Sequence, residues 1–252
     1  MQESNSTSQI KNIIVSMLVS VLIFAAILLP FYANFKQKKA IVTYRTVYSK
    51  LLLANRVYAT LDSQEQGVYD TTIPANDFAE MYFTPYLTIE SFCKGDQSAC
   101  WKKPPYKDLK NTKYFNKSMY SIVLDNNSVI GFHKEPKQNL MSIIVDTDGI
   151  KGQNKLGKDI FVFYFYNDKT RPTLCKDSVY KDKEIPNGIH FGGYDECGIP
   201  QDYYDYKKLY DKKFPDACSK KAEAGKYGLG VGAACGAMLY KNSWVMDNKY
   251  PW

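Results

Sequence analysis

Residues 12–34 read NIIVSMLVSVLIFAAILLPFYAN, and this uncharged stretch decides the fold of the chain. A helix over residues 13–33 would be about 30 Å long, because each residue adds roughly 1.5 Å, and this matches the hydrocarbon thickness of a bilayer. The apolar run is longer than that of a secretory signal peptide, and no small-residue cleavage site follows it. Both features favour an anchor that is retained in the mature protein. We expect the lipid-facing residues to include Ile13, Val15, Leu18, Leu22, Phe24, Ile27, Leu29 and Pro30.

Apolar residues continue beyond the anchor at spacings of three and four, which predicts that the helix runs on with one apolar face. That face would contain Phe35, Ile41, Tyr44, Val47, Tyr48, Leu51, Leu52, Val57, Tyr58 and Leu61. The opposite face is basic, and it is either a solvated helix face or one that lies near anionic lipid or neighbouring subunits. Gly67 fits a helix stop. We therefore expect a short N-terminal segment (1–11), a transmembrane helix (12–34), its amphipathic continuation (35–66) and an exported domain (67–252).

The exported part is long enough for one domain with its own core. Residues 77–87 predict a short helix with Asp77 as its N-cap, ended at Pro85. Four β-rich runs follow, at residues 120–124, 128–132, 141–145 and 160–166, and Asp125-Asn126-Asn127 fits the turn of a hairpin. Residues 228–252 would return to the sheet as a strand or a short helix. The expected fold class is α+β, with the long helix against one face of an antiparallel sheet and an irregular, disulfide-bonded C-terminal region.

Six cysteines follow the apolar segment and none lies within it, which indicates disulfides in an oxidising compartment. The simplest pairing joins sequence neighbours, because each pair closes a short loop: Cys93 with Cys100, Cys175 with Cys197, and Cys218 with Cys235. The flanking charges point the other way, since the positive-inside tendency would place the basic flank with Lys36, Lys38 and Lys39 in the cytoplasm. We give the cysteines more weight and expect the domain on the outer side of the membrane.

The sequence gives little support for catalysis, zinc binding or nucleic-acid binding. No CxxC pair occurs, and the two histidines, His133 and His190, are far apart and outside any recognisable nucleophile motif. The formal net charge of +7 is modest, and no Arg-rich pattern accompanies it. We therefore expect neither an enzyme nor a nucleic-acid partner.

Hard oxygen ligands gather in the loop that precedes the last β-rich run. Asp146, Asp148, Asn154 and Asp159 surround three glycines, a composition that a calcium ion could use with backbone carbonyls completing its shell. The loop is no EF-hand, because its spacing would place Ile150 at a ligand position. The alternative is a turn-rich loop held by Asx hydrogen bonds, with no cofactor.

Tyrosines are dense in the irregular C-terminal part of the chain. Tyr203, Tyr204, Tyr206 and Tyr210 fall within one short stretch. They could form a ligand platform, or they could pack over a thin core.

Three separated segments resemble type IV pilin-like proteins, the family that includes the pseudopilins of type II secretion systems. They are FTPYLTIESFC (83–93), VDTDGIKGQNKLGKDIFVF (145–163) and AACGAMLYKNSWVMD (233–247). The resemblance covers most of the chain and implies a pilin-like fold. It also raises the expectation of calcium, because some pseudopilins bind that ion in their loops.

The chain departs from the family's entry signal, which is a basic leader, then Gly and Phe at the cleavage point, then a glutamate; none of these is present. When Pro30 is matched to the family's helix proline, the first mature residue lies near Gln9. Ser8 then stands where the prepilin peptidase requires glycine, and Ile13 stands where the family has a glutamate. In the family that glutamate neutralises the N-terminal amine of a neighbouring subunit, and pseudopilus tip subunits lack it. The resemblance therefore implies a minor or tip-like subunit.

The function implied by the resemblance is structural. The chain would be a subunit of a type IV pilus or a type II secretion pseudopilus and would contact other pilin-like subunits through its N-terminal helix. It would cross the bacterial inner membrane once, with its domain in the periplasm or outside the cell, and secreted proteins are further candidate partners. The alternative is a membrane-anchored adhesin or substrate-binding module that uses the Tyr-rich region after Asn167.

Overall fold

A computed structural model describes residues 3–61, 69–93, 100–101, 105–112, 114–115, 118–135, 140–167, 185–195, 197–225 and 229–252, with side chains from residue 14 onward. The chain divides into two compact units, Met1–Lys39 and Ala40–Trp252, and we call the second unit the head. The first helix, α1 (Glu3–Leu61), begins in the first unit and ends in the head. The expected boundary between residues 66 and 67 lies outside the described residues.

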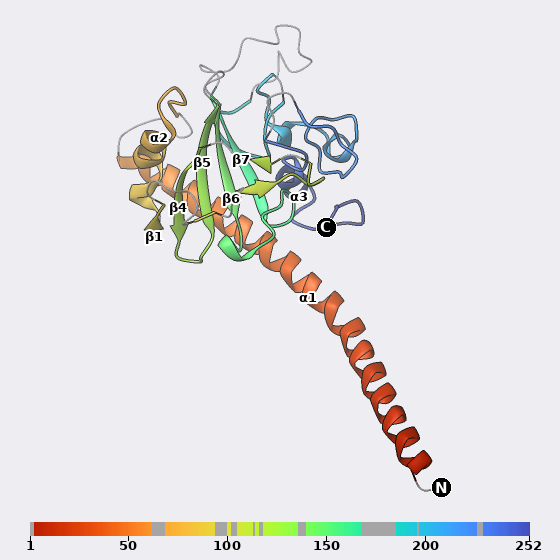
Figure 1. Ribbon diagram of the computed structural model, residues 1–252. Coiled ribbons are helices and arrows are strands. Elements are labelled where there is room, and N and C mark those ends of the chain that lie inside the picture. The colour runs from red at the N-terminus through yellow and green to blue at the C-terminus, as the bar shows by residue number, and fades with distance from the viewer. Residues whose placement is uncertain are drawn as a thin grey trace. The chain divides into compact units, whose positions relative to one another are not determined.

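Six antiparallel strands form the main sheet of the head, in the order β1-β4-β5-β6-β7-β8 (Figure 1). They are β1 (Ile89–Phe92), β4 (Tyr120–Leu124), β5 (Val129–Glu135), β6 (Leu140–Asp146), β7 (Ile160–Tyr166) and β8 (Gly188–Phe191). A smaller two-stranded sheet pairs β2 (Tyr106–Lys107) with β3 (Tyr114–Phe115). The expected α+β class is confirmed, and so is the 125–127 turn between β4 and β5, where Asn127 has a positive φ of 62°.

The part of α1 within the head packs on the sheet through one stripe of residues. Its buried members are Ala40, Tyr44, Val47, Leu51 and Ala54. The Tyr44 ring stacks on Phe161 and Phe163 of β7, with ring centroids 4.5 and 4.6 Å apart. Its hydroxyl donates a 2.7 Å hydrogen bond to the Val162 carbonyl between them. One aromatic side chain thus ties the helix to the middle of the sheet.

The apolar face expected for α1 is partly wrong. Phe35 and Leu61 are 64% and 68% exposed, whereas Ala40 and Ala54 are buried. The buried stripe repeats at alternating spacings of four and three residues, and Phe35 falls outside that series. Alanines at the ends of the stripe let the helix backbone lie close to the sheet, and the spacing of large apolar residues does not show this.

The head has a second short helix, α2 (Ala75–Tyr82), followed by a 3₁₀ turn, η1 (Thr84–Tyr86). The expected short helix is confirmed, but two details are wrong: Asp77 is not its N-cap, and the α-helix ends at Tyr82, before Pro85. The helix begins directly after Pro74. Asp77 lies in its first turn, where its negative charge interacts favourably with the positive end of the helix dipole. Phe78, Phe83 and Phe165 form an aromatic cluster beneath α2, together with Tyr69 and Tyr82.

The sheet is covered on both faces, whereas the sequence predicted cover for one. A second cluster of buried residues includes Trp101, Tyr106, Phe115, Ile144 and Val162. The Trp101 indole donates a 2.9 Å hydrogen bond to the Ser121 hydroxyl on β4. The segment around β2 and β3 therefore supplies the cover of this second face.

The C-terminal part contains a short helix, α3 (Cys235–Lys241), as one of the two expected alternatives. It has small residues because it lies close to α1: a Cβ at Gly236 would be 2.4 Å from the Tyr44 hydroxyl oxygen. The Tyr240 ring stacks on Phe191 of β8, with centroids 4.2 Å apart. The small-residue run around Cys235 thus reflects tight packing against Tyr44.

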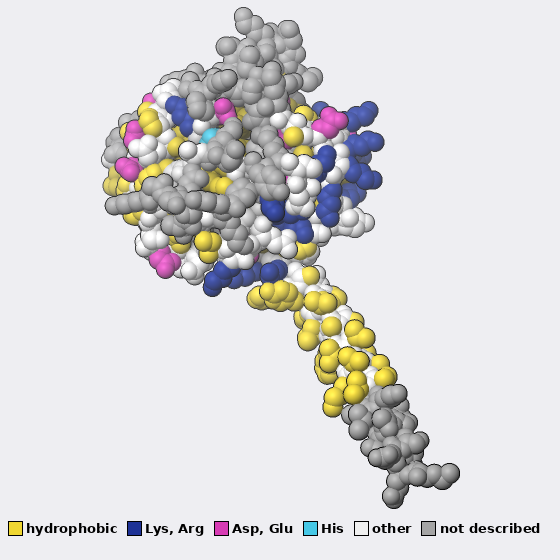
Figure 2. All heavy atoms as spheres, in the orientation of Figure 1, with side chains coloured by type: hydrophobic (Ala, Val, Ile, Leu, Met, Phe, Trp, Pro, Cys, Tyr) yellow, Lys and Arg dark blue, Asp and Glu magenta, His cyan; other side chains and the backbone are white. Residues whose placement is uncertain are grey.

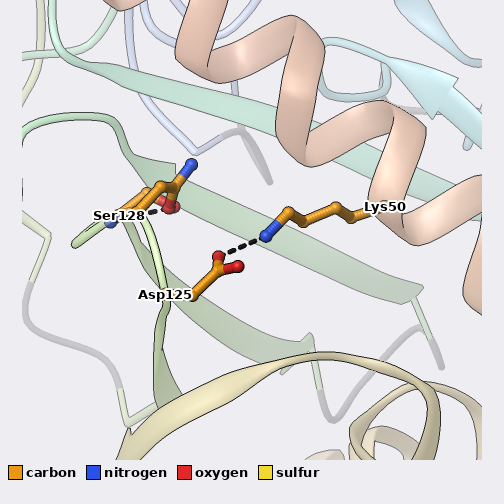
Figure 3. Close-up of polar contacts among 4 residues, drawn as sticks. Lys50, Asp125 and Ser128 are labelled. Carbon is orange, nitrogen blue, oxygen red and sulfur yellow. Dashed lines mark hydrogen bonds and ion pairs between the residues drawn. The ribbon is translucent and has the colours of Figure 1, made fainter.

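An ion pair at the surface joins α1 to the sheet. The Lys50 ammonium reaches from α1 to the Asp125 carboxylate in the turn after β4, beside the Asn126–Ser128 hydrogen bond (Figure 3). Both side chains are partly exposed, at 26% and 46%. Such pairs contribute little to stability, about 0–1 kcal/mol. The buried stripe, and not this pair, holds α1 to the sheet.

Removal of the Tyr44 hydroxyl by Tyr44→Phe should lower the free energy of unfolding by about 0.5–1.5 kcal/mol. The expected loss is small because the Val162 carbonyl keeps a 2.9 Å bond from the Gly192 amide. Tyr69→Phe is the matched control: the Tyr69 hydroxyl is buried without a hydrogen-bond partner among the described residues, so its removal should leave stability unchanged or raise it. Unfolding of the full chain in detergent, followed by near-ultraviolet circular dichroism, measures both. Equal losses in the two variants would contradict this account of the helix–sheet contact.

Candidate functional site

The first unit presents apolar side chains to its surroundings on every side of the helix. Large apolar side chains between residues 14 and 29 are exposed by 49% to 68%. One candidate membrane span, with a mean hydropathy of 2.7, occurs among the described residues. Such a helix near the N-terminus has the length and composition of a membrane anchor or a signal sequence. Pro30 lies inside the helix, and the Ile13 side chain lies outside the description.

Two of the three expected disulfides are present in the described part of the head. Cys93 is bonded to Cys100, and Cys218 is bonded to Cys235. Cys197 is also disulfide-bonded, and its expected partner Cys175 lies outside the described residues. Disulfides persist in oxidising compartments. Together with the apolar helix, they indicate a head outside the cytoplasm.

The four expected calcium ligands come together in the loop between β6 and β7. Both oxygens of the Asp159 carboxylate accept hydrogen bonds from backbone amides, Oδ2 from Gln153 and Asn154 at 2.6 and 3.0 Å, and Oδ1 from Lys155 at 2.6 Å. Asp146 Oδ2 accepts a 3.0 Å bond from the Asn154 side-chain amide. Hydrogen bonds to the Asp159 and Asp146 carboxylates therefore hold the loop in its conformation, as the Asx alternative predicted.

Negative charge is concentrated in this loop. Burial raises the pKa of Asp146 well above its ordinary value, and the nearby carboxylates of Asp159 and Asp148 raise it further. These last two carboxylates approach each other at Gly152, where a Cβ would be 2.0 Å from Asp148 Oδ1 and 2.6 Å from Asp159 Oδ2. Only glycine fits at this position, because any side chain would displace one of the two carboxylates.

The fit of a calcium ion to this loop is mixed. The repulsion between carboxylates favours a cation, and so does the Asn154 Oδ1 atom, which is buried without a hydrogen-bond partner among the described residues. Against a cation, three amides already occupy Asp159, and within the described ranges no three acidic, His or Cys side chains are arranged to hold a metal. The structure assembles the predicted residues, and the amides on Asp159 favour the loop held by Asx hydrogen bonds over a calcium site.

The tyrosines of the C-terminal part pack against neighbouring segments. Tyr204 is buried, and the Tyr206 hydroxyl donates a 2.8 Å bond to Asp247. The Lys249 ammonium lies 4.8 Å from the centre of the Tyr210 ring and donates a 3.1 Å bond to its hydroxyl. These contacts join the Tyr-rich stretch to the C-terminal segment, so the structure favours packing over a ligand platform.

The two histidines are not brought together. His133 lies on β5 and His190 on β8, and two strands of the sheet separate them. His190 Nδ1 is 3.3 Å from Asp202, and its Nε2 is 2.9 Å from the Pro186 carbonyl oxygen. This histidine joins β8 to the segment that follows it.

Comparison of the chain with family models, curated proteins and solved structures finds no match. The architecture alone therefore bears on function: a long N-terminal apolar helix, packed in its second half on an antiparallel sheet, with disulfides in the head. This is the pilin-like arrangement that the sequence resemblance implied.

Neutralising Asp146 should change how stability depends on pH. A carboxyl whose pKa is raised in the folded state binds more protons there than in the unfolded chain, so stability falls as the pH rises above about 3.9. Asp146→Asn removes this penalty, and the stability of the variant relative to the native chain should increase between about pH 4 and pH 7. The altered hydrogen bonds of the variant affect all pH values alike, so the slope is the readout. A difference that is constant with pH would contradict the assigned burial and repulsion.

Calcium should have little effect on stability, because backbone amides already hold the Asp159 carboxylate. We expect the thermal unfolding midpoint of the head to be the same with excess calcium as with a chelator. A rise of several degrees with calcium, absent in the Asp148→Asn variant, would show instead that the loop binds the ion.

Proposed function

We propose that the chain is a structural subunit of a type IV pilus or a type II secretion pseudopilus, in a minor or tip-like position. The single observation that carries the proposal is the apolar helix of the first unit, whose side chains are exposed all round. Lipid can cover such a helix, and so can other helices of the same kind. The proposal assigns the chain no catalytic step.

Exchange of lipid contacts for helix contacts would drive assembly. In a bilayer, apolar helices associate through close van der Waals packing, and small residues let their backbones approach. Ser16 and Ser20 lie one turn apart on the same face of α1, where the Ser20 hydroxyl bonds to the Ser16 carbonyl at 2.9 Å. We assign contacts with neighbouring pilin-like subunits to this face.

The disulfides and the apolar helix support a location in the bacterial inner membrane, crossed once, with the head in the periplasm or outside the cell. On that side the head would contact neighbouring heads and secreted proteins. A minor or tip-like position is supported by Ile13, which stands where the family's shaft subunits carry a glutamate. Without that carboxylate, the helix cannot neutralise the amine of a neighbour in the membrane.

Crosslinking within the membrane tests the proposal. Cysteines placed at Ser16 and Ser20 should form specific crosslinks to other pilin-like subunits in native membranes. Cysteines at Leu18 and Leu22, which lie about 200° around the helix, are the matched control and should crosslink less, since each residue turns the helix by about 100°.

A second experiment separates an assembly subunit from a simple anchor. Replacement of residues 12–34 by an unrelated spanning helix of equal length should abolish assembly while the head still folds. Retained function after the replacement, together with the absence of specific crosslinks at both pairs of positions, would contradict the proposal and would favour the alternative of a solitary membrane-anchored binding module.

A further inference from the structure

Aromatic and basic side chains gather at the end of the apolar helix. Figure 2 shows hydrophobic side chains along the described part of the helix that precedes them, with no charged side chain among them. We call the gathered residues the juxtamembrane cluster, which consists of Phe31, Tyr32, Phe35, Lys36, Lys38 and Lys39. All six side chains are exposed, and all six residues belong to the first unit.

The cluster occupies one side of α1. Each residue turns an α-helix by about 100°, so the six positions fall within an arc of about 160°. Ala33, Asn34 and Gln37, which are interspersed with them in the sequence, fall on the remaining side and carry no charge. The Lys36 ammonium lies 5.1 Å from the centre of the Tyr32 ring, one turn earlier. The rings and the ammonium groups therefore face the same surroundings.

The position of the cluster along the helix identifies these surroundings. The hydrocarbon core of a bilayer takes about 20 residues of helix, so a span that begins at Ile13 ends near Tyr32. The three rings then lie at the boundary between acyl chains and headgroups, where aromatic side chains are enriched in membrane proteins. The three lysines follow within about 11 Å of helix. Helix side chains point back toward the N-terminus, and this directs the ammonium groups to the level of the lipid phosphates.

The sequence argues against a second copy of α1 as the partner of these lysines. No aspartate or glutamate occurs between Glu3 and Asp62, so the helix of a neighbouring copy offers them no carboxylate. Such helices side by side would instead bring like charges together. Lipid phosphates, by contrast, lie at the depth of the cluster. The location of the cluster in the membrane, together with its rings, selects the partner where charge alone would not.

We propose that the juxtamembrane cluster binds phospholipids with a net negative charge in the outer leaflet of the membrane. The rings would lie against the upper part of the acyl chains, and the ammonium groups would pair with the phosphates. A net negative headgroup is needed because the amine of a zwitterionic lipid already neutralises its phosphate. The proposal rests on the membrane anchor of the proposed function, and it does not depend on assembly with other subunits.

Electron spin resonance of spin-labelled lipids tests the proposal with the full chain reconstituted in phosphatidylcholine vesicles. Lipids in contact with the protein give a motionally restricted signal, and its size is compared for labelled phosphatidylglycerol and labelled phosphatidylcholine. We expect the restricted fraction to be enriched in phosphatidylglycerol about fivefold at about 20 mM salt, which is the effect of roughly one lysine near an anionic surface. The enrichment should weaken at about 500 mM salt, because salt screens the pairing.

Loss of the three charges should abolish the preference. In the variant that combines Lys36→Gln, Lys38→Gln and Lys39→Gln, both labelled lipids should be restricted equally. In the variant that combines Lys36→Arg, Lys38→Arg and Lys39→Arg, the enrichment should stay within about twofold of the native value, because the charge is kept.

The matched control removes the same charge from exposed positions of the head. The variant that combines Lys212→Gln, Lys213→Gln and Lys221→Gln should keep the native enrichment. Equal losses in the two glutamine variants would overturn the proposal, because the preference would then follow net charge. Equal restriction of both lipids by the native chain would also overturn it, while the membrane anchor would stand. A native chain that restricts neither lipid does not cross the bilayer, and this result would contradict the proposed function as well.

Discussion

The packing of the α1 stripe against the sheet is the contact on which the rest of the head depends. Tyr44, Val47 and Leu51 are completely buried between helix and strands. Burying each such side chain contributes about 1.5–3 kcal/mol, so these few residues supply a large share of the stability of a domain. The elements around Tyr44 leave little free space. Two phenylalanine rings of β7 stack on the Tyr44 ring, and α3 needs a glycine to approach its hydroxyl.

Much of this fold could be predicted from the sequence, and the failures have physical causes. Strands β4, β6 and β7 are rich in β-branched and aromatic residues, so their positions were found within a residue. Strands β1 and β8 are four residues long and contain polar residues or glycine, so their pairing depends on neighbours that a local pattern does not show. The alanines of the α1 stripe were missed for a related reason. A small side chain adds little to a hydrophobic pattern. Its contribution is that it lets two elements pack closely, which the sequence does not show.

The carboxylate loop shows the same limit at a site. Composition predicted correctly that Asp146, Asp148, Asn154 and Asp159 lie close together. It could not show that backbone amides occupy Asp159, because those bonds depend on how the loop folds. The hydrogen bond between Tyr206 and Asp247 was not predicted either, since these residues come from separate segments that the fold brings together. A site whose residues come from one segment can be predicted from the sequence. A site whose residues come from separate segments cannot.

The most direct test of the central claim is amide hydrogen exchange on the full chain in detergent micelles, read residue by residue. If the stripe holds α1 to the sheet, the amides of residues 40–54 should exchange as slowly as those of β6 and β7, only through global unfolding of the head. If those amides exchange quickly while the sheet stays protected, α1 opens independently of the sheet, and the account is contradicted.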